Sequence, residues 1–248
     1  MMNPSLGATS LFQASLAIKW GENRRPYGAG EFFKGLSAQA IDEFESLAVY
    51  FCCPAATVLI KGDQDPFSVM FVLDGAVGLR MASYAGKRFI LGIAGPGEIL
   101  GLTSAISGIP AGIEAEARCL CSIALLKRED FLDFLLRYPI ASRNVMRELS
   151  QQHAQACERL RIVGLTSSAP AKLAQLLLEW CTRGRQTRTG TQIRFLLTHE
   201  EVGECIGSSR ETVTRALNDF RHRNLVELNG SILTVPSRSA LEIYAGIG

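Results

Sequence analysis

The stretch "THEEVGECIGSSRETVTRALNDFRHRNLVELNGSILTV", residues 198–235, decides the fold of the C-terminal part of the chain. It contains two successive pairs with the spacing of a capping box, Thr198 with Glu201 and Ser208 with Glu211, and such boxes begin helices. An Asn-Gly turn between alternating apolar residues follows and is typical of a β-hairpin. The order helix, turn, helix, hairpin predicts a winged helix-turn-helix.

The second predicted helix has one apolar and one charged side. Val213 and Leu217 face the first helix, whereas Arg210, Glu211 and Arg215 project from the opposite side. In a helix-turn-helix the second helix enters the major groove with its N-terminal residues at the base edges. Arginine donates two hydrogen bonds to guanine and glutamate accepts one from cytosine, so the trio suits G·C pairs. The alternative is a solvated helix face on which Glu211 serves only as a cap.

Hydroxyl groups at the two helix starts are candidates for phosphate contacts, and they belong to Thr198, Ser209 and Thr212. A basic stretch, "CTRGRQTRTGTQIR" (residues 181–194), is either a second phosphate-binding segment or a solvated hairpin. Its arginines are Arg183, Arg185, Arg188 and Arg194. Phosphate contacts make affinity for DNA strongly salt dependent.

Residues 36–235 resemble the superfamily of the cyclic-AMP receptor protein and FNR. The motifs that carry the resemblance are the Gly62-Asp63 turn, "MFVLDGAVGL" (residues 70–79), "GPGEILG" (95–101), a long helix and "SSRETVTR" (208–215). The cyclic-AMP receptor subgroup has R-E-x-x-x-R in its recognition helix, here Arg210, Glu211 and Arg215. The resemblance implies a homodimer that binds a TGTGA-like inverted repeat in double-stranded DNA. RNA polymerase would be a further partner of an activator.

The N-terminal half has the pattern of a small β domain. A helix is predicted over 37–50, and between Cys52 and Leu126 short β-branched and aromatic runs alternate with turn signals. This spacing favours an antiparallel β-roll or barrel. The expected class is α+β, with a flexible arm (1–30), a β-roll sensor (31–138), a dimerisation helix (139–167) and a winged helix-turn-helix (168–248).

The helix after Pro139 carries a heptad-like seam flanked by polar residues, which is typical of a dimer interface. The residues of this seam are Met146, Leu149, His153, Ala156, Leu160 and Val163. The alternative is that the helix packs only on its own domain.

The resemblance also points to an effector pocket. Its candidate residues are Glu98, Leu100, Gly101, Leu102, Thr103, Ala111, Gly112 and Cys157. In the cyclic-AMP receptor protein a Glu binds the ribose, an Arg-Ser pair binds the phosphate, and Thr-Ser reaches across from the long helix. Here Leu102, Ala111-Gly112 and Cys157-Glu158 stand in those places. An unpaired buried phosphate is costly, so cyclic AMP is not expected, and the small apolar lining, with Ala105, fits a small apolar ligand or none.

No cofactor is predicted. An iron-sulfur centre requires four thiolates, and no cysteine precedes Cys52, which disfavours an FNR-type cluster. His153 and Cys157, one turn apart, could bind haem or a metal, but a partly hydrated histidine at a helix seam is the favoured interpretation. Cys52, Cys53, Cys119 and Cys121 lie in predicted strands, where a free cysteine usually acts as a small hydrophobe, and a redox switch is the alternative.

Composition and motifs narrow the class of protein. The 248 residues have a net charge of only +2, so DNA contact must come from a local patch. Seven scattered cysteines without a C-x-x-C pair indicate a reducing cytoplasm, and no membrane segment is expected. No catalytic motif is present, so an enzyme is not expected. The remaining rival is a winged helix that binds protein instead of DNA.

Overall fold

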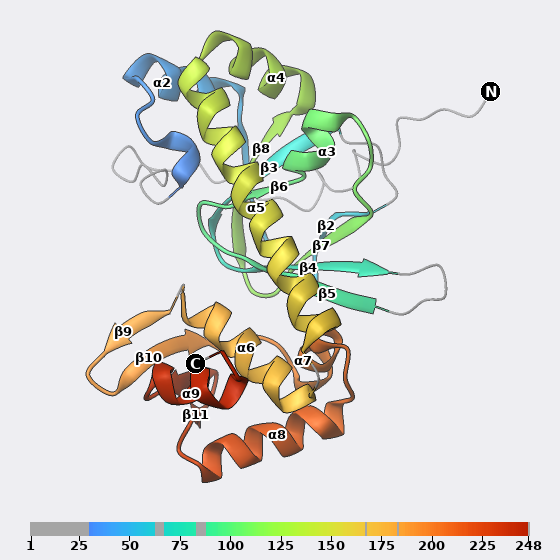
Figure 1. The fold of residues 1–248 in the computed structure, drawn as a ribbon. Coiled ribbons are helices and arrows are strands. Elements are labelled where there is room, and N and C mark those ends of the chain that lie inside the picture. The colour runs from blue at the N-terminus through green and yellow to red at the C-terminus, as the bar shows by residue number, and fades with distance from the viewer. Residues whose placement is uncertain (1–29, 63–66, 83–87, 167, 183, 248) are drawn as a thin grey trace, which may run out of the picture. The chain divides into compact units, whose positions relative to one another are not determined.

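The computed structural model describes residues 30–62, 67–82, 88–166, 168–182 and 184–247. The chain divides into two compact units (Figure 1). Of the described residues, the first unit comprises 30–62, 67–82 and 92–153, and the second comprises 88–91, 154–166, 168–182 and 184–247. The expected N-terminal arm, residues 1–30, lies outside the described residues except for Gly30.

Two four-stranded sheets form the β-roll. Their strand orders are β1-β8-β3-β6 and β2-β7-β4-β5. Every pairing in these sheets whose register is described is antiparallel, as the sequence predicts. The strands are β1 (Val49–Cys53), β2 (Val58–Ile60), β3 (Ser68–Asp74), β4 (Val77–Ala82), β5 (Arg88–Ala94), β6 (Ile99–Leu100), β7 (Ile113–Ala117) and β8 (Cys121–Lys127).

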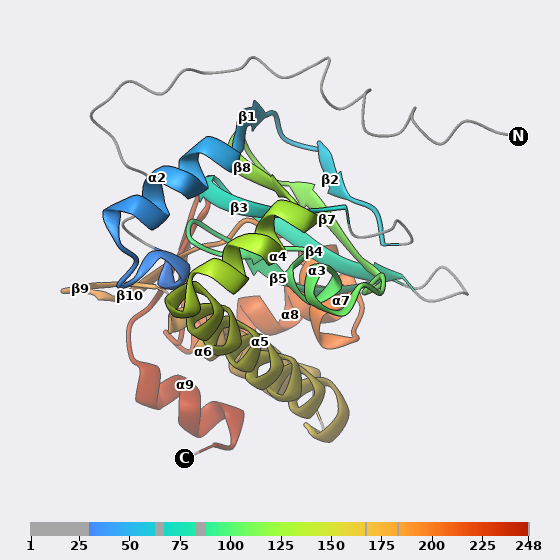
Figure 2. The same cartoon turned by 90° about the horizontal axis from the view of Figure 1, so that it is seen from above.

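Short helices precede, interrupt and follow the strands (Figure 2). They are η2 (Glu31–Phe33), α2 (Ala38–Leu47), α3 (Leu102–Ser107) and α4 (Arg128–Arg137). The predicted helix over 37–50 is therefore shorter than expected, because the β-branched and aromatic run that begins at Val49 pairs with β8 instead. Helix α3 was not predicted, and it affects the interpretation of the effector pocket.

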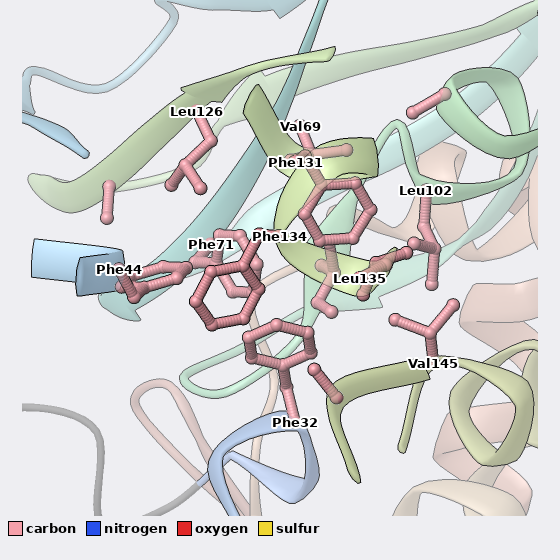
Figure 3. Packing of buried hydrophobic residues seen from close by; sticks show 14 of the residues in the cluster. Phe32, Phe44, Val69, Phe71, Leu102, Leu126, Phe131, Phe134, Leu135 and Val145 are labelled. Atoms are coloured by element: carbon pink, nitrogen blue, oxygen red, sulfur yellow. The ribbon is translucent and has the colours of Figure 1, made fainter. Parts of the chain in front are cut away.

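Strand β3 separates two hydrophobic cores because alternate side chains point to opposite faces of a sheet. Val69 and Phe71 face the helices, in a cluster rich in phenylalanine (Figure 3). Met70 and Val72 face the second sheet and fill the interior of the roll. The buried aromatic side chains of the first cluster are Phe32, Phe33, Phe44, Phe71, Phe131 and Phe134.

The predicted long helix is confirmed as α5 (Pro139–Leu165), which begins directly after α4 ends at Arg137. Its first turns are fixed to the β-roll unit by Asn144, whose side chain is buried. The Asn144 amide nitrogen donates to the carbonyl oxygens of Phe32 and Lys34, each at 2.8 Å. The N-terminal part of α5 is therefore held by the same segment that supplies the aromatic core.

The last turns of α5 belong to the second unit. Arg159 is buried and forms an ion pair with Glu179 of α6, with Nε to Oε2 at 2.7 Å and a hydrogen bond from a terminal nitrogen to Oε1 at 2.9 Å. Ile162 is also buried, and the Lys172 ammonium donates to the Val163 carbonyl at 2.7 Å. The C-terminal end of α5 is therefore fixed to α6.

Replacing Glu179 with glutamine should lower the free energy of unfolding of the second unit by about 1–3 kcal/mol, because Arg159 would keep its buried charge without a counter-ion. Urea unfolding measures the change. Glu158→Gln is the matched control, since Glu158 pairs with exposed Arg161 on the same helix and exposed pairs contribute about 0–1 kcal/mol. Equal effects of the two substitutions would contradict the role given to Arg159.

The second unit contains helices and a four-stranded sheet of order β11-β12-β10-β9. The Asn229-Gly230 hairpin is confirmed as β11 and β12, and the basic stretch forms a second hairpin, β9 and β10. The elements are α6 (Ala169–Cys181), β9 (Arg185–Thr187), β10 (Gly190–Arg194), α7 (His199–Ile206), α8 (Arg210–His222), β11 (Glu227–Asn229), β12 (Ile232–Val235) and α9 (Arg238–Ala245). Helix α9 was not predicted from the sequence, and its Tyr244 ring packs on Phe220 with ring centroids 4.9 Å apart.

Candidate nucleic-acid interface and effector site

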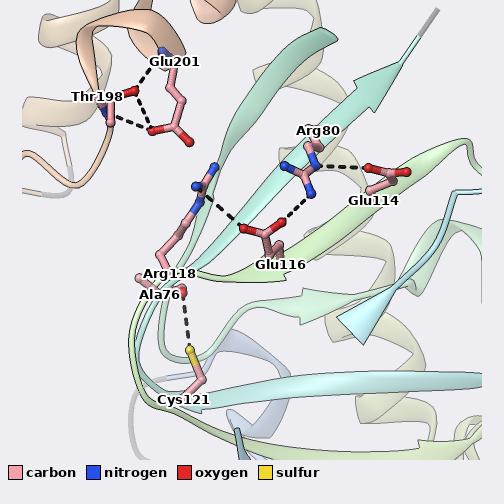
Figure 4. A network of polar contacts seen from close by, with 8 residues as sticks. All are labelled: Ala76, Arg80, Glu114, Glu116, Arg118, Cys121, Thr198 and Glu201. Carbon is pink, nitrogen blue, oxygen red and sulfur yellow. Dashed lines mark hydrogen bonds and ion pairs between the residues drawn. The ribbon is translucent and has the colours of Figure 1, made fainter. Parts of the chain in front are cut away.

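Helix α7 begins with the capping box that the sequence predicts (Figure 4). The Glu201 backbone nitrogen donates to the Thr198 hydroxyl at 3.2 Å, and the Thr198 backbone nitrogen donates to the Glu201 carboxylate at 2.8 Å. The helix ends at Gly207. A Cβ atom on Gly203 would lie 2.6 Å from the Ser208 carbonyl oxygen, so only glycine permits this close approach of the turn to α7.

Thr198→Ala should lower the free energy of unfolding of the second unit by about 1 kcal/mol, because the substitution removes the hydroxyl that accepts from the α7 backbone. Thr198→Ser retains that hydroxyl and should unfold like the unchanged protein. Thermal unfolding followed by circular dichroism compares the two. A serine variant as unstable as the alanine variant would show that the cap is not the source of the effect.

The cap of α8 differs from the prediction. The sequence predicts Ser208 as the N-cap, but the N-cap is Ser209, whose hydroxyl accepts from the Thr212 backbone nitrogen at 3.3 Å. Ser208 is instead part of the turn, where its backbone nitrogen donates to the Gly203 carbonyl at 2.8 Å. The second predicted capping box is therefore wrong by one residue.

The three predicted base-reading side chains are exposed at the start of α8. Arg210, Glu211 and Arg215 are exposed, as the sequence predicts, whereas Val213 and Leu217 are buried. At about 3.6 residues per turn Glu211 and Arg215 lie opposite the buried face, whereas Arg210, seven residues before Leu217, lies at its border and not opposite it. An Arg215 terminal nitrogen lies 3.4 Å from the Thr212 hydroxyl, which holds the guanidinium beside the cap.

The Glu211 carboxylate accepts a hydrogen bond from its own backbone nitrogen and another from Ser209, and these bonds lower its pKa. Glu211 is therefore an ionised acceptor at neutral pH.

A hydrogen-bonded chain fixes the start of α7 to α8. The Thr214 hydroxyl donates to the Arg210 carbonyl at 2.9 Å, and His199 Nδ1 lies 2.9 Å from the same hydroxyl. Because a hydroxyl has one proton and Thr214 gives it to Arg210, the bond to His199 requires a proton on Nδ1. A surface cavity of about 240 Å³ lies beside these hydrogen bonds and is lined by Thr198, His199, Glu200 and Arg210. His199 and Glu200 are not among the site residues predicted from the sequence.

The basic hairpin presents exposed arginines, Arg185, Arg188 and Arg194. Arg183 lies outside the described residues. These side chains add positive charge to the surface of the second unit.

Two domain families match the chain. The Crp-like helix-turn-helix domain matches residues 171–244, and the cyclic nucleotide-binding domain matches residues 52–138. The order of these domains is that of a sensor followed by a DNA-binding unit. The chain belongs to the CRP/FNR family of transcription regulators. As a member of that family it is a DNA-binding regulator and not an enzyme.

Relatives of this CRP/FNR regulator come from several bacteria. It is 27% identical over 86% of its length to the cyclic AMP receptor protein of Thermus thermophilus, 95% of which is covered. It is 25% identical over 75% of its length to the CRP-like cAMP-activated global transcriptional regulator of Mycobacterium tuberculosis, and the match covers 82% of that protein. The fold resembles that of FixK2 from Bradyrhizobium japonicum, with a TM-score of 0.71 and 22% sequence identity. The superposition covers 79% of this chain and 96% of FixK2.

In the loop expected to bind an effector, several polar groups hydrogen bond to one another. The Glu98 carboxylate accepts from the Gly95 backbone nitrogen at 2.7 Å and so closes the "GPGE" turn. Gly101 precedes α3, Thr103 on that helix is exposed, and the Ala111 backbone nitrogen donates to the Ser104 hydroxyl at 3.0 Å. Gly112 has a φ of +67°, a conformation that an L-amino acid rarely adopts.

The expected apolar lining is divided between the two cores. Leu102 and Ala105 face the phenylalanine-rich cluster because α3 turns them toward the helices (Figure 3). Leu100 faces the interior of the roll. Leu102 therefore lies in the hydrophobic core and does not line the interior of the roll beside Leu100.

The predicted seam of α5 is mostly exposed in the single chain. Met146, His153, Ala156 and Leu160 are exposed, with Leu160 72% accessible, whereas Leu149 and Val163 are half-buried. Cys157 is exposed as well. Among the described residues no group of three or more His, Cys, Asp or Glu side chains could hold a metal ion, and none of the described helices is long and apolar enough to cross a membrane.

Proposed function

We propose that this regulator binds a TGTGA-like inverted repeat as a homodimer. The observation that carries the proposal is the exposed trio Arg210, Glu211 and Arg215, held at the start of α8 by the Ser209 cap. Two arginines suit guanines and the ionised Glu211 suits a cytosine, and these bases occur in TGTGA and its complement. The family and its DNA-binding domain support the same assignment.

Fluorescence anisotropy with two duplexes tests the base preference. A TGTGA-N6-TCACA duplex should bind at least about tenfold more tightly than a TTGAT-based duplex of equal length, because each mismatched base pair costs about 1–3 kcal/mol. The slope of log affinity against log salt should be steeply negative for both duplexes, since phosphate contacts release counterions. Equal affinity for the two duplexes would exclude the proposed motif but not DNA binding.

The exposed apolar residues of α5 support the homodimer. Met146 and Leu160 are 61% and 72% accessible in the single chain, and apolar side chains at heptad spacing are covered by a partner helix in a coiled coil. Sedimentation of the full chain should therefore give twice the chain mass of 27.0 kDa. Leu160→Glu should shift the protein toward the monomer. A monomeric unchanged protein at micromolar concentration would contradict this assignment.

We also infer that cyclic AMP is not the effector. The residue in the place of the ribose-binding Glu is Leu102, buried in the core, and the phosphate-binding position falls near Gly112 with its positive φ. A cyclic phosphate would thus have no charge partner in that loop. Titration calorimetry with cyclic AMP should give no saturable heat, and operator affinity should be unchanged by it. A rise in operator affinity on adding cyclic AMP would overturn the inference.

A further inference from the structure

Two buried cysteines face each other across neighbouring strands of the β-roll. Strands β1 and β8 are antiparallel, and their register places Cys53 directly opposite Cys121. Facing residues project from the same side of a sheet, and both side chains lie in the core between the two sheets, 4% and 0% accessible. Both thiols are free.

A third thiol connects this pair to the surface. Cys119 lies in the turn that precedes β8, is half-buried, and packs against the same core. The Cys121 sulfur lies 3.4 Å from the Cys119 carbonyl oxygen. Burial raises the pKa of the Cys121 thiol, and the neighbouring Cys119 thiol raises it further. The three thiols therefore form a row, which we call the thiol row: Cys119 near the surface, then Cys121, then Cys53. Cys52 is on the other face of β1, with its sulfur 3.3 Å from the Ser122 hydroxyl.

The geometry of the facing pair fits a disulfide. Directly opposed residues of antiparallel strands have Cα atoms about 4.5–5.5 Å apart, and disulfides span about 4.4–6.8 Å between Cα atoms. No change of register is therefore required to join Cys53 to Cys121.

Direct oxidation of the buried pair is slow for a physical reason. Burial raises the pKa of the Cys53 thiol to about 11, which lowers its thiolate fraction near neutral pH by about a hundredfold. The higher nucleophilicity of a more basic thiolate recovers part of this loss, so the net rate falls by about tenfold. An oxidant therefore reaches the pair most readily through the half-buried Cys119.

We propose that the thiol row is a peroxide-sensitive site in which oxidation begins at Cys119 and ends as a Cys53–Cys121 disulfide. The Cys119 thiolate attacks one oxygen of hydrogen peroxide, which gives a sulfenic acid and, after protonation, one water. The Cys121 sulfur then attacks the Cys119 sulfur, and hydroxide leaves as a second water after it takes up the Cys121 proton. Finally the Cys53 sulfur attacks Cys121, and Cys119 leaves as a thiolate and takes up the Cys53 proton. Two thiols lose two hydrogen atoms and one peroxide becomes two waters.

The disulfide would join two strands whose far ends lead to different helices. Strand β1 follows α2, and β8 continues directly into α4, which in turn leads into α5. A bond between Cys53 and Cys121 closes a loop of the chain that contains β2 to β7. Oxidation would therefore stiffen the sensor domain, through chemistry that does not depend on which DNA sequence the protein binds.

The test is thiol mapping of the full-length protein by differential alkylation and non-reducing peptide mass spectrometry, with and without hydrogen peroxide. A linked pair of peptides that contains Cys53 and Cys121, two hydrogen atoms lighter than the reduced pair and restored by dithiothreitol, is expected. Cys119→Ala should slow formation of this disulfide by about tenfold. Without Cys119 the oxidant must react directly with the buried pair, where the thiolate fraction of Cys53 is low. Cys181→Ala is the matched control, because Cys181 is an equally buried thiol in α6, and it should leave the rate unchanged.

Three results would overturn the proposal. In the first, Cys157 is oxidised while the alkylation of Cys53 and Cys121 is unchanged. In the second, the final product is a Cys119–Cys121 disulfide that Cys53 does not attack, and in the third, the Cys119→Ala variant forms the Cys53–Cys121 disulfide as fast as the unchanged protein. Mapping the unsubstituted protein decides the first two results even if a variant fails to fold. Anisotropy with the TGTGA duplex, measured in parallel, separates failure of this proposal from failure of the DNA assignment.

Discussion

An Arg215→Ala variant, or an Arg210→Ala variant, should lose about 1–3 kcal/mol of discrimination at one guanine of each half-site, because each guanidinium offers two parallel donors to guanine O6 and N7. That loss corresponds to about 5- to 150-fold in relative affinity. Because both side chains are exposed, the free energy of unfolding should remain within about 0.5 kcal/mol of its original value.

The measurement is anisotropy with a set of duplexes in which each half-site base is changed in turn. A base-reading arginine gives a loss confined to one base pair, whereas an arginine that contacts phosphate weakens all duplexes equally and reduces the salt slope. Arg221→Ala is the matched control, since Arg221 is an exposed arginine in the last turn of the same helix. Full discrimination by both Arg210→Ala and Arg215→Ala would exclude them as base-reading residues.

Phe134→Ala should lower the free energy of unfolding of the β-roll unit by about 3–5 kcal/mol, the range for removing a buried aromatic side chain. The Phe134 ring is inaccessible to solvent. Its centroid lies 4.7 Å from that of Tyr138, 6.0 Å from that of Phe44 and 6.2 Å from that of Phe32. The substitution therefore removes contacts with α2, with η2 and with Tyr138, which joins α4 to α5.

Thermal and urea unfolding followed by circular dichroism measure the loss. Leu136→Ala provides the control on the same helix, because Leu136 is 83% accessible and exposed substitutions change stability by about 0.5 kcal/mol or less. A similar loss in both variants would mean that helix propensity, and not the aromatic core, determines the stability of α4.

Features that depend on local sequence were predictable. The long helix, the Thr198 capping box and the exposed arginines of α8 follow from residue types at fixed spacings, and the structure has each of them. The predicted N-cap of α8 was one residue too early. Ser208 and Ser209 are both good N-cap residues, and only the geometry of the turn decides between them. Helix α9 was missed because its sequence is short and follows the last recognised hairpin.

Features that depend on strand register were not predictable from the sequence. Sequence spacing places Cys53 and Cys121 sixty-eight positions apart, and only the pairing of β1 with β8 makes them neighbours. A shift of one residue would turn each side chain to the other face of the sheet. The position of Leu102 was likewise undetermined, since it depends on α3, a six-residue helix without a strong start signal.

The burial of Leu102 has a consequence for how ligand specificity can evolve in this protein. Introducing a ribose-binding carboxylate by the single change Leu102→Glu would place a charge among phenylalanine rings instead of in the interior of the roll, and an unpaired buried charge is strongly unfavourable. A carboxylate at this position could bind a ligand in the roll only if α3 turned position 102 out of the core.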